Sequence, residues 1–131
     1  MAKELVLVDT SILIDFFRKS DKANSRLMKL TTGGFRFCIS AVTEFEIYTG
    51  TTQNQIDYWE DFLLRTPVLA FDKEVARTAV DINKALRKQS KLIDMADLFI
   101  AATAVHYSLP LITLNVKHFE RVDELILLPQ P

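Results

Sequence analysis

The stretch Leu5-Val6-Leu7-Val8-Asp9-Thr10-Ser11, near the start of the chain, sets the expected fold. Residues 5–8 are apolar without alternation, which is typical of a central parallel strand covered on both faces. Asp9 follows directly, at the carboxyl end of that strand. The spacing of the apolar residues that follow is that of a short buried helix: Ile12, Leu13, Phe16 and Phe17. A strand that leads at once into a helix indicates an α/β arrangement.

The rest of the chain continues this alternation. The expected strands lie at 35–40, 68–70, 109–114 and 125–128, and the expected helices at 21–30, 40–48, 55–64, 72–91 and 94–107. Because the connections are short, the strands should form a mainly parallel sheet of four or five short strands with helices on both faces. We expect a single domain over residues 1–131.

The composition narrows the class of protein. The chain has 131 residues, with 16 Lys+Arg, 17 Asp+Glu and only three glycines. A formal net charge of -1 argues against nucleic-acid binding through bulk positive charge. Three glycines are too few for a glycine-rich phosphate loop of the dinucleotide or P-loop kind.

The cellular setting can also be predicted. The single cysteine, Cys38, allows no internal disulfide, and no run of about 18 apolar residues marks a membrane span. Residues 1–5 pass into the first strand too soon for a signal peptide. These features predict a reducing, cytoplasmic setting and no membrane association.

Two acidic residues stand in unusual surroundings. Asp9 follows the first strand, and in an open parallel sheet the functional crevice lies beyond the carboxyl ends of the strands. Asp97 is embedded in the apolar segment 95–102, where an unpaired carboxylate costs several kcal/mol. Asp94, three residues earlier, shares that helix face as a cap or as a neighbour of the site. Taken singly, each acid is explained about as well by a structural role, a helix cap for Asp9 and the helix dipole for Asp97, as by a functional one.

Glu46 is the third acid. It flanks an inward helix stripe that we assign to Val42, Phe45 and Thr49, whereas Glu44 points nearly opposite, into solvent. Three acids near one sheet edge repel one another unless a cation lies between them. Oxygen donors without a Cys ligand or a His pair favour Mg²⁺ or Mn²⁺. Attack of water on a phosphodiester is the natural reaction of such a site.

The same residues resemble the PIN-domain ribonucleases, in particular the VapC-type toxins of bacterial toxin–antitoxin pairs. The resemblance spans essentially the whole chain and rests on four blocks in order, residues 6–15, 39–50, 97–104 and 111–119. It implies a PIN-like three-layer α/β/α sandwich and an Mg²⁺- or Mn²⁺-dependent endoribonuclease that acts on RNA as a growth-arresting toxin. It also implies a cognate VapB-like antitoxin and self-association into a homodimer.

By this resemblance, Asp9 and Asp97 correspond to the chief metal ligands, and Glu46 corresponds to the residue that positions water or a second ion. Asn115 stands where some members have Asp, and His118 stands where others have Asp before Phe. The amide of Asn115 carries no negative charge and so cannot replace an acidic ligand. Two alternatives remain, a site for one ion and a site for two ions that RNA phosphate completes. The further candidates for hydroxyl supply, ligand support or substrate binding are Thr10, Ser11, Arg18, Asp94, Thr113 and Asn115.

Two other functions are kept as alternatives. A phosphatase of the haloacid-dehalogenase type would use Asp9 as nucleophile, but that type expects a second Asp where this chain has Ser11. A degenerate PIN-like or receiver-like module would bind a partner protein without catalysis, and Asn115 is the feature that favours it. Four aromatic residues of early helices are expected in the core rather than in a partner groove: Phe16, Phe17, Trp59 and Phe62.

Overall fold

Four parallel strands form the middle layer, in the order β3-β2-β1-β4, in a computed structural model that describes residues 4–131. The strands are β1 (Leu5–Val8), β2 (Arg36–Ser40), β3 (Val68–Leu69) and β4 (Leu111–Ile112). The expected parallel sheet is therefore confirmed. Of the fifth strand expected at 125–128, a single parallel bridge between Leu111 and Leu127 forms. Residues 1–3, which entered the signal-peptide expectation, lie outside the described residues.

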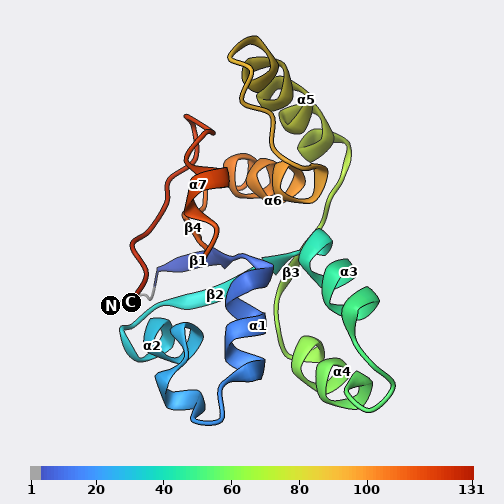
Figure 1. Ribbon diagram of the computed structural model, residues 1–131, viewed down its shortest axis with the longest axis vertical. Helices are drawn as coiled ribbons and strands as arrows, with labels where there is room; N and C mark the ends of the chain where they lie inside the picture. Colours follow the sequence, from blue (N-terminus) through green and yellow to red (C-terminus); the bar gives the residue numbers. More distant parts are fainter. Residues whose placement is uncertain (1–3) are drawn as a thin grey trace.

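Helices cover both faces of the sheet (Figure 1). One side carries α1 (Thr10–Arg18), α2 (Arg26–Thr32), α3 (Ala41–Gly50) and α4 (Ile56–Leu64), and the other carries α5 (Lys73–Lys88), α6 (Met95–His106) and α7 (Val116–Phe119). The helix expected over 21–30 is divided into a short 3-10 helix, Lys22–Asn24, and α2. Two successive caps explain the division, because Asp21 accepts from the backbone N–H of Ala23 and Ser25 accepts from that of Met28.

Alternate residues of β1 face the two helical layers. Val6 and Val8 pack with the core beneath α1, α2 and α4, whereas Leu7 packs with the core beneath α5 and α6. All three side chains are fully buried. The non-alternating apolar run thus corresponds to a central strand, which holds Asp9 at the middle of the sheet edge.

Of the four aromatic residues expected in the core, Trp59 is buried, and Phe16, Phe17 and Phe62 are partly buried and pack against the same core. Trp59 is 2% exposed, and its ring centroid lies 5.1 Å from that of Phe17 and 5.7 Å from that of Phe62. Phe16 and Phe62 pair at 5.5 Å. Within residues 4–131, no helix combines the length and the apolar character needed to cross a membrane.

The inward stripe assigned to α3 is wrong. The buried residues of this helix are Thr43 and Ile47, whereas Phe45 is 65% exposed and Thr49 is exposed. The helix starts at the carboxyl edge of the sheet, so a polar side chain, Thr43, faces inward and contacts other polar groups there. Val42 and Phe45 instead line a shallow apolar groove beside α6.

Leu63 and Leu64, adjacent on α4, offer a test of the core. Leu63 is 4% exposed and Leu64 is 85% exposed. Leu63→Ala is expected to lower the free energy of unfolding by about 2–4 kcal/mol, because it removes buried methyl groups and leaves a cavity. Leu64→Ala should change it by less than about 0.5 kcal/mol. Urea unfolding of both variants measures the difference, and equal effects would contradict the packing of α4.

Candidate active site

A cleft of about 650 Å³ opens where β1 ends. The three acids singled out in the sequence, Asp9, Glu46 and Asp97, line it together. They come from the end of β1, from α3 and from the first turn of α6, so the fold joins three distant segments. The remaining lining residues are Thr10, Ser11, Ile14, Asp15, Arg18, Lys19, Leu114 and Asn115.

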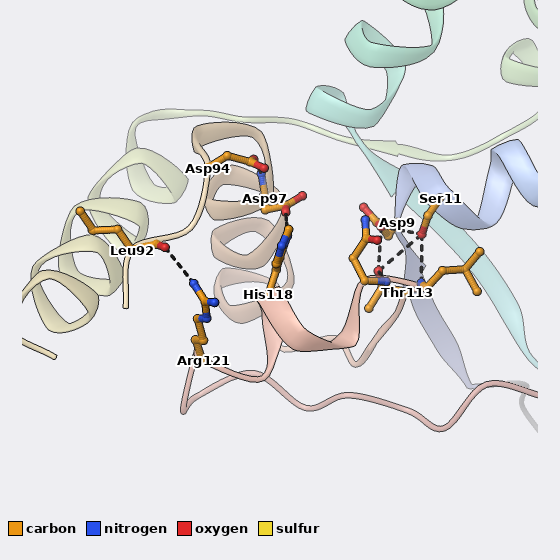
Figure 2. A network of polar contacts seen from close by, with 10 residues as sticks. Asp9, Ser11, Leu92, Asp94, Asp97, Thr113, His118 and Arg121 are labelled. Atoms are coloured by element: carbon orange, nitrogen blue, oxygen red, sulfur yellow. Dashed lines mark hydrogen bonds and ion pairs between the residues drawn. The ribbon is translucent and has the colours of Figure 1, made fainter. Parts of the chain in front are cut away.

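Asp9 occupies the N-cap position of α1, but its side chain makes no capping hydrogen bond. Its Oδ2 instead accepts from the hydroxyls of Ser11 and Thr113, each at 2.7 Å (Figure 2). The backbone N–H of Asp9 donates to the carbonyl of Ile112 at 3.0 Å. Helix capping therefore does not account for this acid, and its carboxylate is held in place at the end of the central strand.

The two hydroxyls that hold Asp9 are themselves fixed by the backbone after β4. The N–H of Leu114 donates to Ser11 Oγ at 3.0 Å, and the N–H of Asn115 donates to Thr113 Oγ1 at 2.9 Å. Thr113 is 1% exposed and lies behind Asp9 rather than on the cleft wall. The predicted neighbours Ser11 and Thr113 thus orient Asp9 with neutral donors.

Glu46 is held by a threonine from α1. The Thr10 hydroxyl donates to Glu46 Oε1 at 2.6 Å and lies 3.0 Å from the hydroxyl of Thr43. The backbone N–H of Thr43 donates to Ser40 Oγ, which caps α3. Thr43 was not predicted as part of this network. Its position three residues before Glu46, on the same helix face, is the sequence signal that could have identified it.

Asp97 lies in the first turn of α6 and is buried, as Asp9 is. The residue is 9% exposed, and its backbone N–H donates to Oδ1 of Asp94, the N-cap of α6. Nδ1 of His118 lies 3.0 Å from Asp97 Oδ2 (Figure 2). Burial raises the pKa of Asp97, the hydrogen bond with His118 lowers it, and the negative charges of Asp94 and Asp9 raise it again.

Each of the three carboxylates has one oxygen that the protein engages and one that it does not. The engaged atoms are Oδ2 of Asp9, Oε1 of Glu46 and Oδ2 of Asp97. Within residues 4–131, no hydrogen bond or ion pair reaches the second oxygen of any of them. Hard, anionic oxygens on one cleft wall are of the kind that Mg²⁺ or Mn²⁺ binds. Among the described residues, the three whose ligand atoms all lie within 4.8 Å of one another are Asp94, Asp97 and His118, so Asp9 and Glu46 line the cleft without joining that compact group.

The two basic residues that line the cleft, Arg18 and Lys19, differ in whether an acidic side chain of the protein lies beside them. Asp15 Oδ1 lies 4.0 Å from Lys19 Nζ and 4.0 Å from Arg26 Nη1, so the charge of Asp15 is compensated by two cationic neighbours. The i to i+4 spacing of Asp15 and Lys19 is the sequence signal for this pair. Arg18 is exposed and, in the part of the chain that the structure describes, forms no hydrogen bond or ion pair. Its guanidinium is therefore free to meet an anionic ligand.

Residues 6–125 match the model of the PIN domain. The chain belongs to the PIN-domain family. Ribonuclease VapC1 of Methanocaldococcus jannaschii is 39% identical over 120 residues, which cover 91% of this chain and 82% of that protein. The expected membership among VapC-like PIN domains is thereby confirmed.

Solved structures show the same PIN fold. The DNA-bound VapBC from Salmonella typhimurium aligns over 96% of this chain and 97% of that chain, with a TM-score of 0.83 and 22% identity. A toxin–antitoxin complex from Klebsiella pneumoniae aligns over 92% of this chain and 95% of that chain, with a TM-score of 0.69 and 29% identity. The expected three-layer α/β/α sandwich is confirmed.

The buried carboxylate predicts a pH-dependent stability. Because the pKa of Asp97 is raised in the folded state, its ionised form destabilises the fold at neutral pH, and the cost disappears as pH falls through the raised pKa toward 3.8. In EDTA at pH 7, Asp97→Asn should therefore be more stable than the wild type and unfold at a higher Tm. The gain should vanish below the ordinary range of Asp.

Asp123→Asn makes the same chemical change at an exposed position and should leave Tm unchanged. Thermal unfolding of the three proteins from pH 3 to pH 8 measures both effects. A loss of stability in Asp97→Asn at pH 7 without divalent ions would contradict the electrostatic account.

Proposed function

We propose that this protein is a divalent-metal-dependent endoribonuclease and the toxin of a toxin–antitoxin pair. One observation carries the proposal: Asp9, Glu46 and Asp97 converge on a single cleft, and each keeps an oxygen without a partner in the described chain. The similarity to a protein named Ribonuclease VapC1 supports the choice of RNA as substrate. The similarity to a chain of a toxin–antitoxin complex supports an antitoxin partner.

Asp9, Glu46 and Asp97 are the residues that would hold Mg²⁺ or Mn²⁺. The ion, when bound, supplies Lewis-acid activation of water and neutralises charge on the scissile phosphate. Ser11 and Thr113 fix the Asp9 carboxylate, and Thr10 fixes Glu46, so the ligand oxygens are oriented before substrate arrives. Arg18, free on the rim, is suited to a phosphate of the RNA backbone.

The alternatives are less well supported. Ser11 donates to Asp9 Oδ2, so the position at which a haloacid-dehalogenase-type phosphatase needs a second carboxylate holds a hydroxyl committed to orienting the first. A partner-binding module without catalysis does not require three acids with unengaged oxygens in one cleft. The cytoplasmic location, the homodimer and the single domain over 1–131 stay predictions.

Loss of a ligand charge should abolish cleavage. Asp9→Asn and Asp97→Asn are each expected to lower the rate of RNA cleavage in Mn²⁺ by about 100-fold or more, because each removes an anionic donor from the metal site. Asp123→Asn serves as the control and should cleave like the wild type. A fluorogenic RNA assay, with circular dichroism to verify folding, measures the effect.

Two results would count against this proposal. Wild-type rates in Asp9→Asn would show that the site is wrongly assigned. A wild-type protein that binds Mn²⁺ yet cleaves no RNA, across ribosomal, transfer and messenger RNA, would favour the non-catalytic module.

Thr113 provides a test of ligand orientation. Thr113→Val removes a hydroxyl that donates to Asp9 and should weaken Mn²⁺ binding by about 10-fold, as is usual for a group that orients a ligand. Thr103→Val makes the same change at another fully buried site, where the hydroxyl only bonds the Phe99 carbonyl within α6. Calorimetric titration with Mn²⁺ compares the two variants, and equal affinities would contradict the role of Thr113.

A further inference from the structure

A smaller pocket of about 280 Å³, the side pocket, adjoins the acidic cleft. It lies between α1, α3 and the start of α4, and it shares the lining residues Ile14, Arg18 and Glu46 with the cleft. Its other lining residues include Phe17, Ile47, Thr52, Gln55 and Trp59. We propose that the side pocket binds one unstacked RNA base beside the cut and prefers a base with carbonyl oxygens, uracil or guanine. The inference rests on the proposed function in one respect, that the ligand of the cleft is RNA.

The size and the walls of the side pocket suit a single base. Its volume of about 280 Å³ is just under the ~300–1,000 Å³ of small-molecule sites, so it has room for a fragment the size of one base. Ile47 and Phe17 provide apolar lining, and the ring centroid of Phe17 lies 5.1 Å from that of Trp59. Proteins bind the unstacked bases of single-stranded RNA against aromatic side chains of this kind.

Trp59 brings an unused hydrogen-bond donor to the side pocket. The residue is 2% exposed, and within residues 4–131 its indole N–H donates to no acceptor. A buried indole N–H ordinarily has a partner. In that part of the chain, the buried side-chain atom that lacks both a partner and solvent contact is Nε of Arg26, so the indole N–H keeps some access to solvent. Because Trp59 lines the side pocket, this donor is available to a ligand bound there.

Gln55 and Thr52 add two further donors. Gln55 is the N-cap residue of α4, but its side chain makes no capping hydrogen bond. Its Oε1 accepts from the backbone N–H of Thr52 at 3.5 Å, whereas its Nε2 and the Thr52 hydroxyl donate to no acceptor in the described chain. Carbonyl oxygens of uracil and guanine can accept from such donors. The amino group of adenine is itself a donor and would leave them unpaired.

Arg18 connects the side pocket with the acidic cleft. It lines both, it is exposed, and in the described chain it has no hydrogen bond or ion pair. The phosphate that joins a base in the side pocket to the nucleotide in the cleft would pass this guanidinium, which suits a charge-assisted hydrogen bond. The competing occupant is a segment of a protein partner, which apolar walls would also accept. The unpaired cation beside the cleft favours the polyanionic ligand, RNA.

The fluorescence of Trp59 provides the test, because it is the only tryptophan of the chain and lines the side pocket. Trinucleotides of uridine, guanosine or adenosine are titrated into the full-length protein that carries Asp9→Asn, in which the RNA stays intact. The uridine and guanosine trinucleotides are expected to change the emission of Trp59 and to bind at least about 5-fold more tightly than the adenosine trinucleotide.

Gln55→Glu, made in the same Asp9→Asn protein, tests the donor directly. It keeps the size of the side chain but replaces the N–H donors with a carboxylate, which repels a carbonyl oxygen. Binding of the uridine trinucleotide should weaken by about 10-fold. The fold should persist, because no cap is lost and an acid suits a helix N-terminus. Circular dichroism verifies it.

Gln53→Glu is the matched control. It makes the same change of charge at an exposed position between α3 and α4 that does not line the side pocket, and it should bind like the Asp9→Asn parent.

Sequencing of cleavage ends from a randomised RNA pool extends the test to the reaction. In Mn²⁺, the wild type should cut where uracil or guanine occupies one fixed position beside the cut. Gln55→Glu should lose the preference at that position, and Gln53→Glu should retain it.

The outcomes separate this inference from the proposed function. Equal or tighter binding of the adenosine trinucleotide, or equal effects of Gln55→Glu and Gln53→Glu, would overturn the base pocket and favour a protein segment as occupant, even if RNA is cleaved. A preference for uridine or guanosine that only Gln55→Glu weakens would establish the base pocket, even if no RNA is cleaved and the proposed catalysis fails.

Discussion

The burial of a carboxyl group at Asp97 is the constraint on which this edge of the molecule depends. Desolvation and two neighbouring acids, Asp94 and Asp9, all oppose its charged form. The hydrogen bond with His118 favours the charged form, but it offsets only part of the effect of desolvation and of the two neighbouring acids. Such a group is expected to cost stability relative to an amide, and a carboxylate kept at that cost is a candidate for the proposed cation site.

The parallel sheet determines which residues share that edge. β1 lies between β2 and β4, and its last residue, Val8, pairs with Ile112. Asp9 and Thr113 therefore follow paired positions and meet at once, although 104 residues separate them. Because β1 pairs with β2, the helices that follow these two strands, α1 and α3, lie in contact, which brings Thr10 to Glu46. The topology alone thus assembles most of the site.

The sequence predicted the parts of this arrangement that depend on strand ends and helix starts. Asp9, Asp97 and the central strand follow from local apolar patterns. The α3 stripe failed because periodicity assumes an apolar inner face, whereas Thr43 faces a polar cluster at the sheet edge. The contact of His118 with Asp97 joins residues 21 apart through the packing of α7 on α6, and no local pattern encodes it. Contacts of this kind, which depend on how helices pack in three dimensions, cannot be predicted from the pattern of a single sequence.

The acids of the cleft differ in whether their side-chain partners are neutral or positively charged, and this difference distinguishes a candidate metal ligand from an acid with a structural role. Asp15 lines the same cleft as Asp9, yet Lys19 and Arg26 lie 4.0 Å from its carboxylate and balance its charge. Asp9 receives only hydroxyl donors, which fix its orientation and leave its charge uncompensated. A cation binds where negative charge is oriented but not neutralised, because a bound Arg or Lys would have to be displaced first. Neutral donors around Asp9 and Glu46 therefore favour the proposed cation binding there, and the charged neighbours of Asp15 are the reason that this acid is left out of the proposed ligand set.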